Sequence, residues 1–197
     1  MTTDQTAPTG FSFTTHPTRT TSAVTGIDVS SLSLQDALDL AILMEDEARE
    51  RYEAFTHIVG GRYPGDAADM FRAMAGAEAK HGAQLLERRR ALFGDAPFRI
   101  TRDMLEDVEA PDRGKPRVFM SARQAMEVAL ASEEKAHDFF AEAKEQVRDD
   151  RVRQLFEELR REELQHQQFV RDRLSALPPG PDVEEDEADE PGMDPGN

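Results

Sequence analysis

The sequence contains no cysteine among its 197 residues. Disulfide bonds, thiolate metal ligands and cysteine nucleophiles are therefore excluded within it. It also lacks any apolar run that approaches the roughly 18 residues of a membrane-spanning helix. The N-terminal segment has neither the basic start nor the apolar centre of a signal peptide. We therefore expect a cytoplasmic protein with no membrane contact.

Basic residues are in the minority, because 24 Lys and Arg against 40 Asp and Glu give a formal net charge of −16. The last 16 residues carry eight acids and no base, and residues 1–30 carry a net −1, which leaves −7 for the part between. Nucleic-acid binding requires a basic surface, so this charge predicts no nucleic-acid partner.

Both ends of the chain differ in composition from its middle. Residues 1–30 are rich in Thr, Ser and Gly, which predicts a flexible or loosely docked N-terminal arm. Prolines follow from position 178, and residues 179–197 read as a disordered acidic tail. We expect one domain at 31–178, and no strand pattern competes with its helical periodicity.

Four helices are predicted, at about 33–58, 66–93, 121–147 and 150–177. Ser33 and Ser121 each begin a capping-box pattern, Asp66 can cap the second helix, and Gly94 can end it. The connection 94–120 is long and contains a possible short helix at about 101–108. Two helical hairpins joined by a long crossover predict an all-α, antiparallel four-helix bundle of the ferritin-like kind.

The apolar face of the second predicted helix is interrupted by an acid and an imidazole. Residues three, four and seven positions apart share one face of a helix. Adding 85 to each position of this face gives a face of the same chemical types in the fourth helix. The two faces are Phe71, Met74, Glu78, His81 and Leu85, and Phe156, Leu159, Glu163, His166 and Val170.

The first and third helices repeat a second pattern at an offset of 88. Each places one glutamate within an otherwise mostly apolar face. The two faces are Leu38, Ile42, Glu45, Ala48 and Tyr52, and Met126, Leu130, Glu133, Ala136 and Phe140. Four carboxylates and two imidazoles are thus predicted to point into one bundle interior.

Burial of an isolated carboxylate costs on the order of several kcal/mol, so four of them require cations. Two divalent ions would neutralise four carboxylates beside two neutral imidazoles, and a Glu-x-x-His spacing lets both side chains bind one ion. Oxygen and nitrogen ligands suit Fe or Mn, although affinity alone excludes neither Zn nor Cu. An interior whose polar residues bond only to each other is the alternative. The predicted metal ligands are Glu45, Glu78, His81, Glu133, Glu163 and His166.

Four segments give the chain a family resemblance over about residues 33–177. They are EDEARERY at 45–52, FRAMAGAEAKH at 71–81, ALASEEKAHDFF at 129–140 and LFEELRREELQH at 155–166. These segments resemble the rubrerythrin-like branch of the ferritin-like superfamily, whose two Glu-x-x-His helices match better than the single one of most ferritins. The six predicted ligands fall on the family's ligand positions.

The resemblance implies a non-haem di-iron oxidoreductase that reacts its diferrous centre with hydrogen peroxide or dioxygen, as a peroxide scavenger or a ferroxidase. It implies two Fe ions, with Mn or a mixed Fe/Mn pair as alternatives, Fe(II) as a partner and a homodimer. The four-cysteine rubredoxin module of typical rubrerythrins is absent from this sequence. A peroxidase would therefore take electrons from a separate protein.

Three further positions bear on this interpretation. Typical rubrerythrins have a second glutamate three residues after the ligand on the third helix, and here that position is Ala136. Tyr52 is expected to donate a hydrogen bond to a ligand carboxylate or to pack in the core. His137 is expected either to support the metal ligands or to bond to a neighbour at the bundle boundary.

Two other function classes remain open from the sequence. One is an iron-binding or storage protein without catalytic turnover, free or housed in a larger shell. The other is a metal-free helical interaction module, which would hold no stoichiometric metal.

Overall fold

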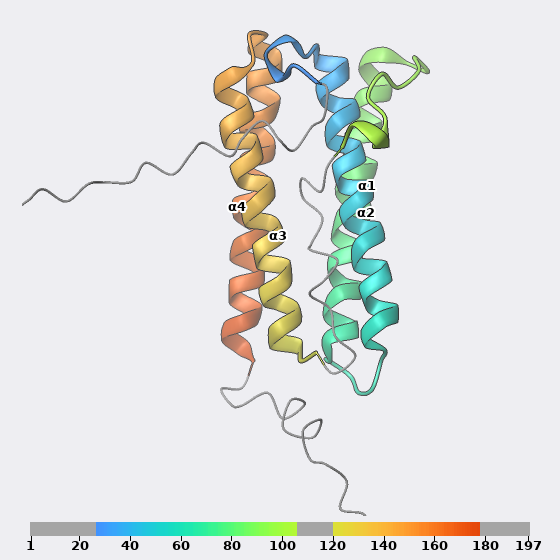
Figure 1. Cartoon of the computed structure of the whole chain (residues 1–197), viewed down its shortest axis with the longest axis vertical. Helices are drawn as coiled ribbons and strands as arrows, with labels where there is room; N and C mark the ends of the chain where they lie inside the picture. The colour runs from blue at the N-terminus through green and yellow to red at the C-terminus, as the bar shows by residue number, and fades with distance from the viewer. Residues whose placement is uncertain (1–26, 106–119, 178–197) are drawn as a thin grey trace, which may run out of the picture.

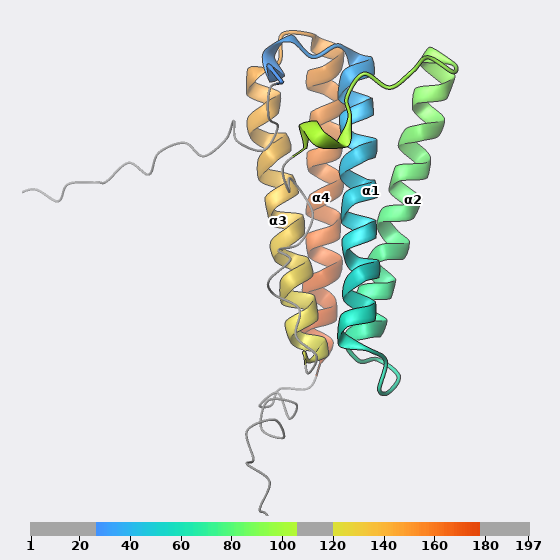
Figure 2. The same cartoon turned by 45° about the vertical axis from the view of Figure 1, so that its right-hand side comes forward.

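Four long helices dominate the computed structural model, which describes residues 27–105 and 120–177. They pair as two antiparallel hairpins, α1 with α2 and α3 with α4, which lie side by side (Figures 1 and 2). One short 3-10 helix precedes α1, and another follows α2. The elements are η1 (Val29–Ser31), α1 (Leu34–Val59), α2 (Ala67–Phe93), η2 (Arg102–Met104), α3 (Ala122–Gln146) and α4 (Asp150–Ala176). The predicted all-α four-helix bundle is confirmed.

The helix starts follow the capping signals in the sequence. The Ser33 hydroxyl accepts a hydrogen bond from the Asp36 amide, and the Asp36 carboxylate accepts one from the Ser33 amide. Ser121 and Gln124 form the same reciprocal pair at the start of α3. The Asp66 side chain accepts from an amide in the first turn of α2. Because these bonds satisfy amides that lack a partner within the helix, they fix where each helix begins.

The bundle begins slightly before the predicted boundary at residue 31. Val29 and Leu32 are buried against the core, and the Arg148 amide donates to the Ser30 carbonyl over 3.3 Å. The rest of the predicted arm, residues 1–26, and the predicted acidic tail lie outside the described residues. Within the described ranges, none of the helices combines the length and apolar character needed to cross a bilayer.

A buried ion pair holds the turn that follows α2. Asp39 and Arg89 are 0% and 2% exposed, and the Arg89 Nε donates to Asp39 Oδ1. The other Asp39 oxygen accepts from the Arg99 amide over 2.8 Å, and Arg89 also donates to the Ala96 carbonyl over 2.8 Å. The Arg89 guanidinium lies 4.2 Å from the centroid of the Phe98 ring. These contacts fasten the start of the crossover to α1.

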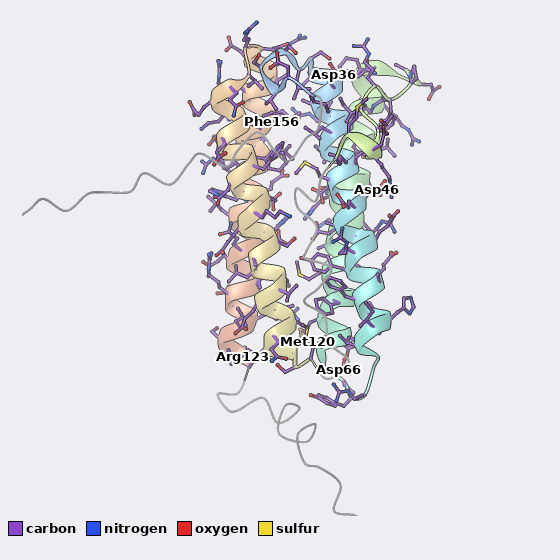
Figure 3. The ribbon with its side chains drawn as sticks, viewed as in Figure 1. Asp36, Asp46, Asp66, Met120, Arg123 and Phe156 are labelled. Carbon is purple, nitrogen blue, oxygen red and sulfur yellow. The ribbon has the colours of Figure 1, made fainter. Side chains whose placement is uncertain are left out.

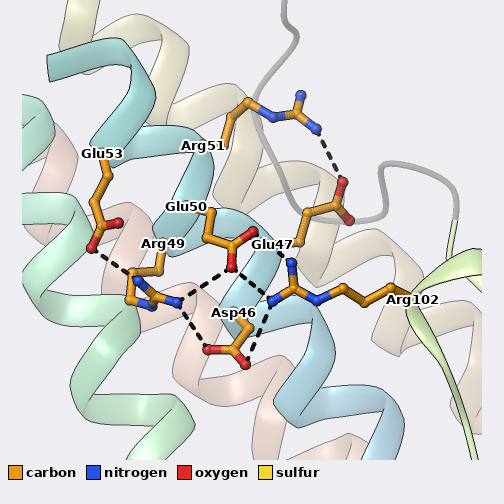
Figure 4. Close-up of polar contacts among 7 residues, drawn as sticks. All are labelled: Asp46, Glu47, Arg49, Glu50, Arg51, Glu53 and Arg102. Atoms are coloured by element: carbon orange, nitrogen blue, oxygen red, sulfur yellow. Dashed lines mark hydrogen bonds and ion pairs between the residues drawn. The ribbon is translucent and has the colours of Figure 1, made fainter. Parts of the chain in front are cut away.

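A second, exposed set of charges attaches the crossover further along α1 (Figure 4). Arg102 of η2 donates to Glu50 over 2.8 Å and lies 3.8 Å from Asp46. Arg49 pairs with the same two carboxylates. η2 is the described part of the short helix predicted at 101–108, and residues 106–119 lie outside the described residues. Single exposed pairs contribute little to stability, but this network fixes η2 beside the middle of α1.

The apolar core is divided into two clusters along the bundle. One contains Leu38 and Phe156, and the other contains Tyr52 and Met120. Figure 3 shows Phe156 and Met120 toward opposite ends of the bundle. On every helix, an interval of three to ten residues separates the buried members of the two clusters, and these intervals contain the predicted ligands.

Candidate metal centre

Six polar side chains converge between the two apolar clusters, and each helix contributes at least one. Glu78, Glu133 and Glu163 are at most 1% exposed, and Glu45 is 5% exposed. The helical spacing turns them inward because they share faces with the Leu, Met and Phe residues above and below them. Four buried carboxylates therefore lie in one region of the interior, as the sequence predicts.

The first half-site consists of Glu45, Glu78 and His81, all from the α1–α2 hairpin. The Nδ1 atom of His81 is 3.9 Å from Glu45 Oε2 and 3.8 Å from Glu78 Oε2, too long for hydrogen bonds. Both Glu78 carboxylate oxygens and the His81 Nδ1 are buried with no hydrogen-bond partner among the described residues. Each buried polar atom without a hydrogen bond lowers the stability by about 1–3 kcal/mol, and a bound cation would satisfy all three atoms.

The second half-site consists of Glu133, Glu163 and His166, all from the α3–α4 hairpin. The Nδ1 atom of His166 lies 3.1 Å from Glu133 Oε2 and 3.3 Å from Glu163 Oε2. Gln167 supports this group, because its side-chain amide donates to the Glu133 backbone carbonyl over 3.2 Å. Glu163 Oε2 is buried without a hydrogen-bond partner among the described residues, so hydrogen bonds hold the Glu133 side of this half-site and a close ionic contact holds the Glu163 side.

The two half-sites meet at their histidines. The His81 and His166 rings are stacked with centroids 4.3 Å apart and an interplanar angle of 6°. Ligand atoms of Glu78, His81 and His166 lie within 4.8 Å of one another, and so do those of Glu133, Glu163 and His166. Bonds of about 2 Å to a common ion place donors within roughly 4 Å of each other, so small movements would complete both coordination spheres.

The burial and the charges of the centre shift the pKa values of Glu133 and His166. Burial raises the pKa of Glu133 well above its usual value; the His166 hydrogen bond opposes this rise, and Glu78 and Glu163 add to it. Burial alone would lower the pKa of His166, but the Glu133 and Glu163 carboxylates beside its ring raise it to about 10. Without metal, a proton on His166 therefore balances part of the carboxylate charge, and a metal ion would displace it.

The structure brings all six predicted ligands together. The two residues predicted to support them, Tyr52 and His137, lie in different surroundings. Tyr52 is fully buried and stacks on Phe71 with ring centroids 6.0 Å apart, so its packing is shown and its contact with a ligand stays a prediction. The Nδ1 atom of His137 lies 3.0 Å from Asp138 Oδ1, and its Nε2 atom lies 3.3 Å from Arg160 Nη1. These are the contacts expected of a boundary histidine bonded to its neighbours.

Two residues near the centre were not among those predicted from the sequence. Gln167 lies four positions after Glu163, so the helical spacing that identified the ligands also places it on the inner face. Glu162 directly precedes Glu163 on α4, and it is exposed. Partial burial of its carboxyl group nevertheless raises its pKa, and the nearby charges of His81 and His166 oppose that rise. Glu162 is therefore close to the open edge of the histidine pair.

A glycine allows α1 and α2 to approach closely beside the first half-site. A Cβ atom at Gly82, the residue after His81, would lie 3.4 Å from the Glu45 Cβ. A Cβ at this position would therefore just reach van der Waals contact with the residue that carries the α1 carboxylate.

Two solved structures are similar to the chain, and the one with the higher TM-score supports the same fold. An uncharacterized conserved protein from Magnetospirillum magnetotacticum MS-1 is 25% identical, with a TM-score of 0.59 over 76% of this chain and 99% of that chain. A hypothetical protein from Pyrococcus furiosus is 20% identical, with a TM-score of 0.48 over 76% of this chain and 95% of that chain. No curated protein matches the chain significantly.

A family comparison agrees with the geometry of the centre. The sequence model of the rubrerythrin family, whose members bind two iron ions in four-helix bundles, matches residues 36–120 and 124–195. The match includes all six predicted ligands and extends over most of the sequence. The chain therefore belongs to the rubrerythrin family.

Proposed function

We propose that the protein is a non-haem di-iron oxidoreductase whose reduced centre reacts with hydrogen peroxide or dioxygen. The observation that carries the proposal is the first half-site, where the buried Glu78 oxygens and the His81 Nδ1 have no hydrogen-bond partner among the described residues. Two iron ions, or Mn or a mixed Fe/Mn pair, would supply Lewis acidity and a change of oxidation state when bound.

The donor set fits such a pair of ions. Each half-site offers two carboxylates and one imidazole, so two divalent ions neutralise the four carboxylates once the His166 proton has left. The groups that act most strongly on Glu133 are Glu78, Glu163 and His166, and none of these is a Lys or Arg. Cations from outside the chain therefore account for the burial better than internal pairing does.

Access to the centre favours a small oxidant. The side chains of His81 and His166 are 20% and 17% exposed, whereas those of the four glutamates are at most 6% exposed. A diatomic molecule or a peroxide can reach the edge of the histidine pair without moving a helix. The apolar clusters on both sides limit the water that surrounds the reacting group.

The number of carboxylates in the centre bears on which oxidant reacts with it. Ala136 is 0% exposed and offers no ligand atom where typical rubrerythrins have a glutamate. The proposal therefore includes both rubrerythrin-like peroxide scavenging and ferroxidase activity. A separate electron-donor protein, for the peroxidase case, and a homodimer also belong to the proposal.

The test is anaerobic loading of the apoprotein with Fe(II), with metal counted per chain, followed by stopped-flow oxidation with dioxygen or with peroxide. We expect close to two ions per chain and rapid oxidation by at least one oxidant. Glu133→Ala and His166→Ala should lose metal, whereas Glu134→Ala, next to a ligand but exposed, should keep it. A wild type that holds no stoichiometric metal, with the same content in all three variants, would point to a metal-free interaction module. Iron that is taken up and oxidised, yet not reduced and turned over, would indicate storage.

A further inference from the structure

The two half-sites carry the same residue types but differ in their internal contacts. In the first half-site, the His81 Nδ1 is 3.8 Å or more from both carboxylates, and three ligand atoms are buried without a hydrogen bond among the described residues. In the second half-site, the His166 Nδ1 is 3.1 Å and 3.3 Å from its two carboxylates, and one ligand atom, Glu163 Oε2, is buried without a hydrogen bond among the described residues. A metal would therefore gain more unsatisfied ligand atoms at the first half-site and would compete with closer contacts at the second.

The hydrogen bonds between each half-site and its neighbouring residues show the same difference. Gln167 donates to the Glu133 carbonyl, and its own side-chain oxygen accepts from Arg171 over 3.1 Å. The sequence repeat that relates Glu163 to Glu78 relates Gln167 to Gly82, which has no side chain. The first half-site therefore lacks the corresponding hydrogen bond between its two helices.

The histidine stack connects the half-sites. His166 lies within reach of the first half-site as well, because one of its ring nitrogens is within 4.8 Å of ligand atoms of Glu78 and His81. With the rings parallel and 4.3 Å apart, neither can turn far without displacing the other. An ion that fixes His81 therefore limits the position of His166 before the second ion binds.

We propose that the centre fills in a fixed order, with the first ion in the Glu45–Glu78–His81 half-site and the second in the Glu133–Glu163–His166 half-site. This inference rests on the proposed metal centre and adds that the two positions have unequal affinity. At limiting metal the protein holds one ion per chain, bound by the α1–α2 hairpin. The second ion binds only after the His166 contacts with Glu133 and Glu163 have been broken.

The test is an anaerobic calorimetric titration of the metal-free protein with Co(II), using two variants at equivalent positions of the repeat. Wild type should show two steps whose dissociation constants differ at least tenfold, which corresponds to about 1.4 kcal/mol. Glu78→Gln should remove the tighter step. Glu163→Gln should remove the weaker step and shift the tighter one less than threefold. Glu87→Gln, an exposed glutamate on α2, should leave both steps unchanged.

A second measurement uses the wild-type protein, so it does not depend on the variants folding. Imidazole ¹⁵N resonances followed during Zn(II) addition should change for His81 up to one equivalent and for His166 mainly between one and two. Two equal steps, or a tighter step that survives Glu78→Gln but not Glu163→Gln, would overturn the order while leaving the di-metal centre standing. Absence of binding in wild type would overturn the proposed centre itself.

Discussion

The imidazole rings of His81 and His166 lie parallel with their centroids 4.3 Å apart, although the residues belong to different hairpins. Each ring directs Nδ1 toward the carboxylates of its own hairpin. Each hairpin therefore supplies one half of the centre, and the two halves are in contact through the histidine pair. Several consequences of this arrangement can be measured.

Replacing Glu78 with methionine should stabilise the metal-free protein. Both Glu78 oxygens are buried without a hydrogen-bond partner among the described residues, and methionine fills a similar volume without polar atoms. We expect the free energy of unfolding in urea to rise by about 1–3 kcal/mol, while metal binding falls. Glu87→Met, at an exposed position, serves as the control. A loss of apoprotein stability would mean that Glu78 has a partner in solution.

The metal-free protein should lose stability as the pH rises. The pKa of His166 is raised to about 10, above its unfolded value of about 6.5. Its contribution to stability is therefore complete below pH 6.5 or so, declines above it and is lost through pH 10 or so. Burial also raises the pKa of Glu133, which acts in the same direction. Urea unfolding across this range should show the decline, and His166→Gln should flatten it.

Metal affinity should show the opposite dependence on pH. The proton on His166 must leave before Nδ1 can bind an ion, so binding should strengthen as the pH rises toward the raised pKa. Calorimetry in two buffers of different ionisation enthalpy measures the released proton. The same heat in both buffers would contradict a proton at this position.

The buried pair between Asp39 and Arg89 should be important for stability and unimportant for the metal. Removing either side chain leaves the other charge buried, so Asp39→Ala or Arg89→Ala should cost about 3–5 kcal/mol in chemical denaturation. The double variant Asp39→Leu with Arg89→Met should recover much of this loss. Metal content at low temperature, where the variants stay folded, should match wild type. Loss of metal in folded protein would show that the turn after α2 also positions the centre.

A glutamate at position 136 tests the choice of oxidant. Ala136 is buried one turn after Glu133, so a fifth carboxylate there should cost the metal-free protein about 3–5 kcal/mol and the loaded protein less. Because typical rubrerythrins have a glutamate at this position, Ala136→Glu should raise the peroxide rate relative to the dioxygen rate. Ala48 is its counterpart in the repeat, and Ala48→Glu should destabilise the protein without changing that ratio.

The helices and the convergence of the six predicted ligands could be predicted from the sequence because both depend on local periodicity. A capping box such as Ser33 with Asp36 involves neighbours, and the Glu-x-x-His motifs repeat at a constant offset. The division into half-sites was not predictable, because the approach of His81 to Glu45 depends on how α1 and α2 dock. Asp39 and Arg89 were missed for a related reason: they lie 50 positions apart, and no repeated pattern connects them.

The containment of each half-site within one hairpin has a consequence for how such a centre can arise. One hairpin supplies a lone glutamate and a Glu-x-x-His pair, and the other supplies the same set. The two hairpins are thus related by a pseudo-twofold repeat. Ala48 and Ala136 keep this repeat intact at the position where typical family members break it with a glutamate. A chain of half this length that associates with its own copy would bring together the same six ligand types. Duplication and fusion of one ancestral hairpin would then be sufficient to produce the present bundle.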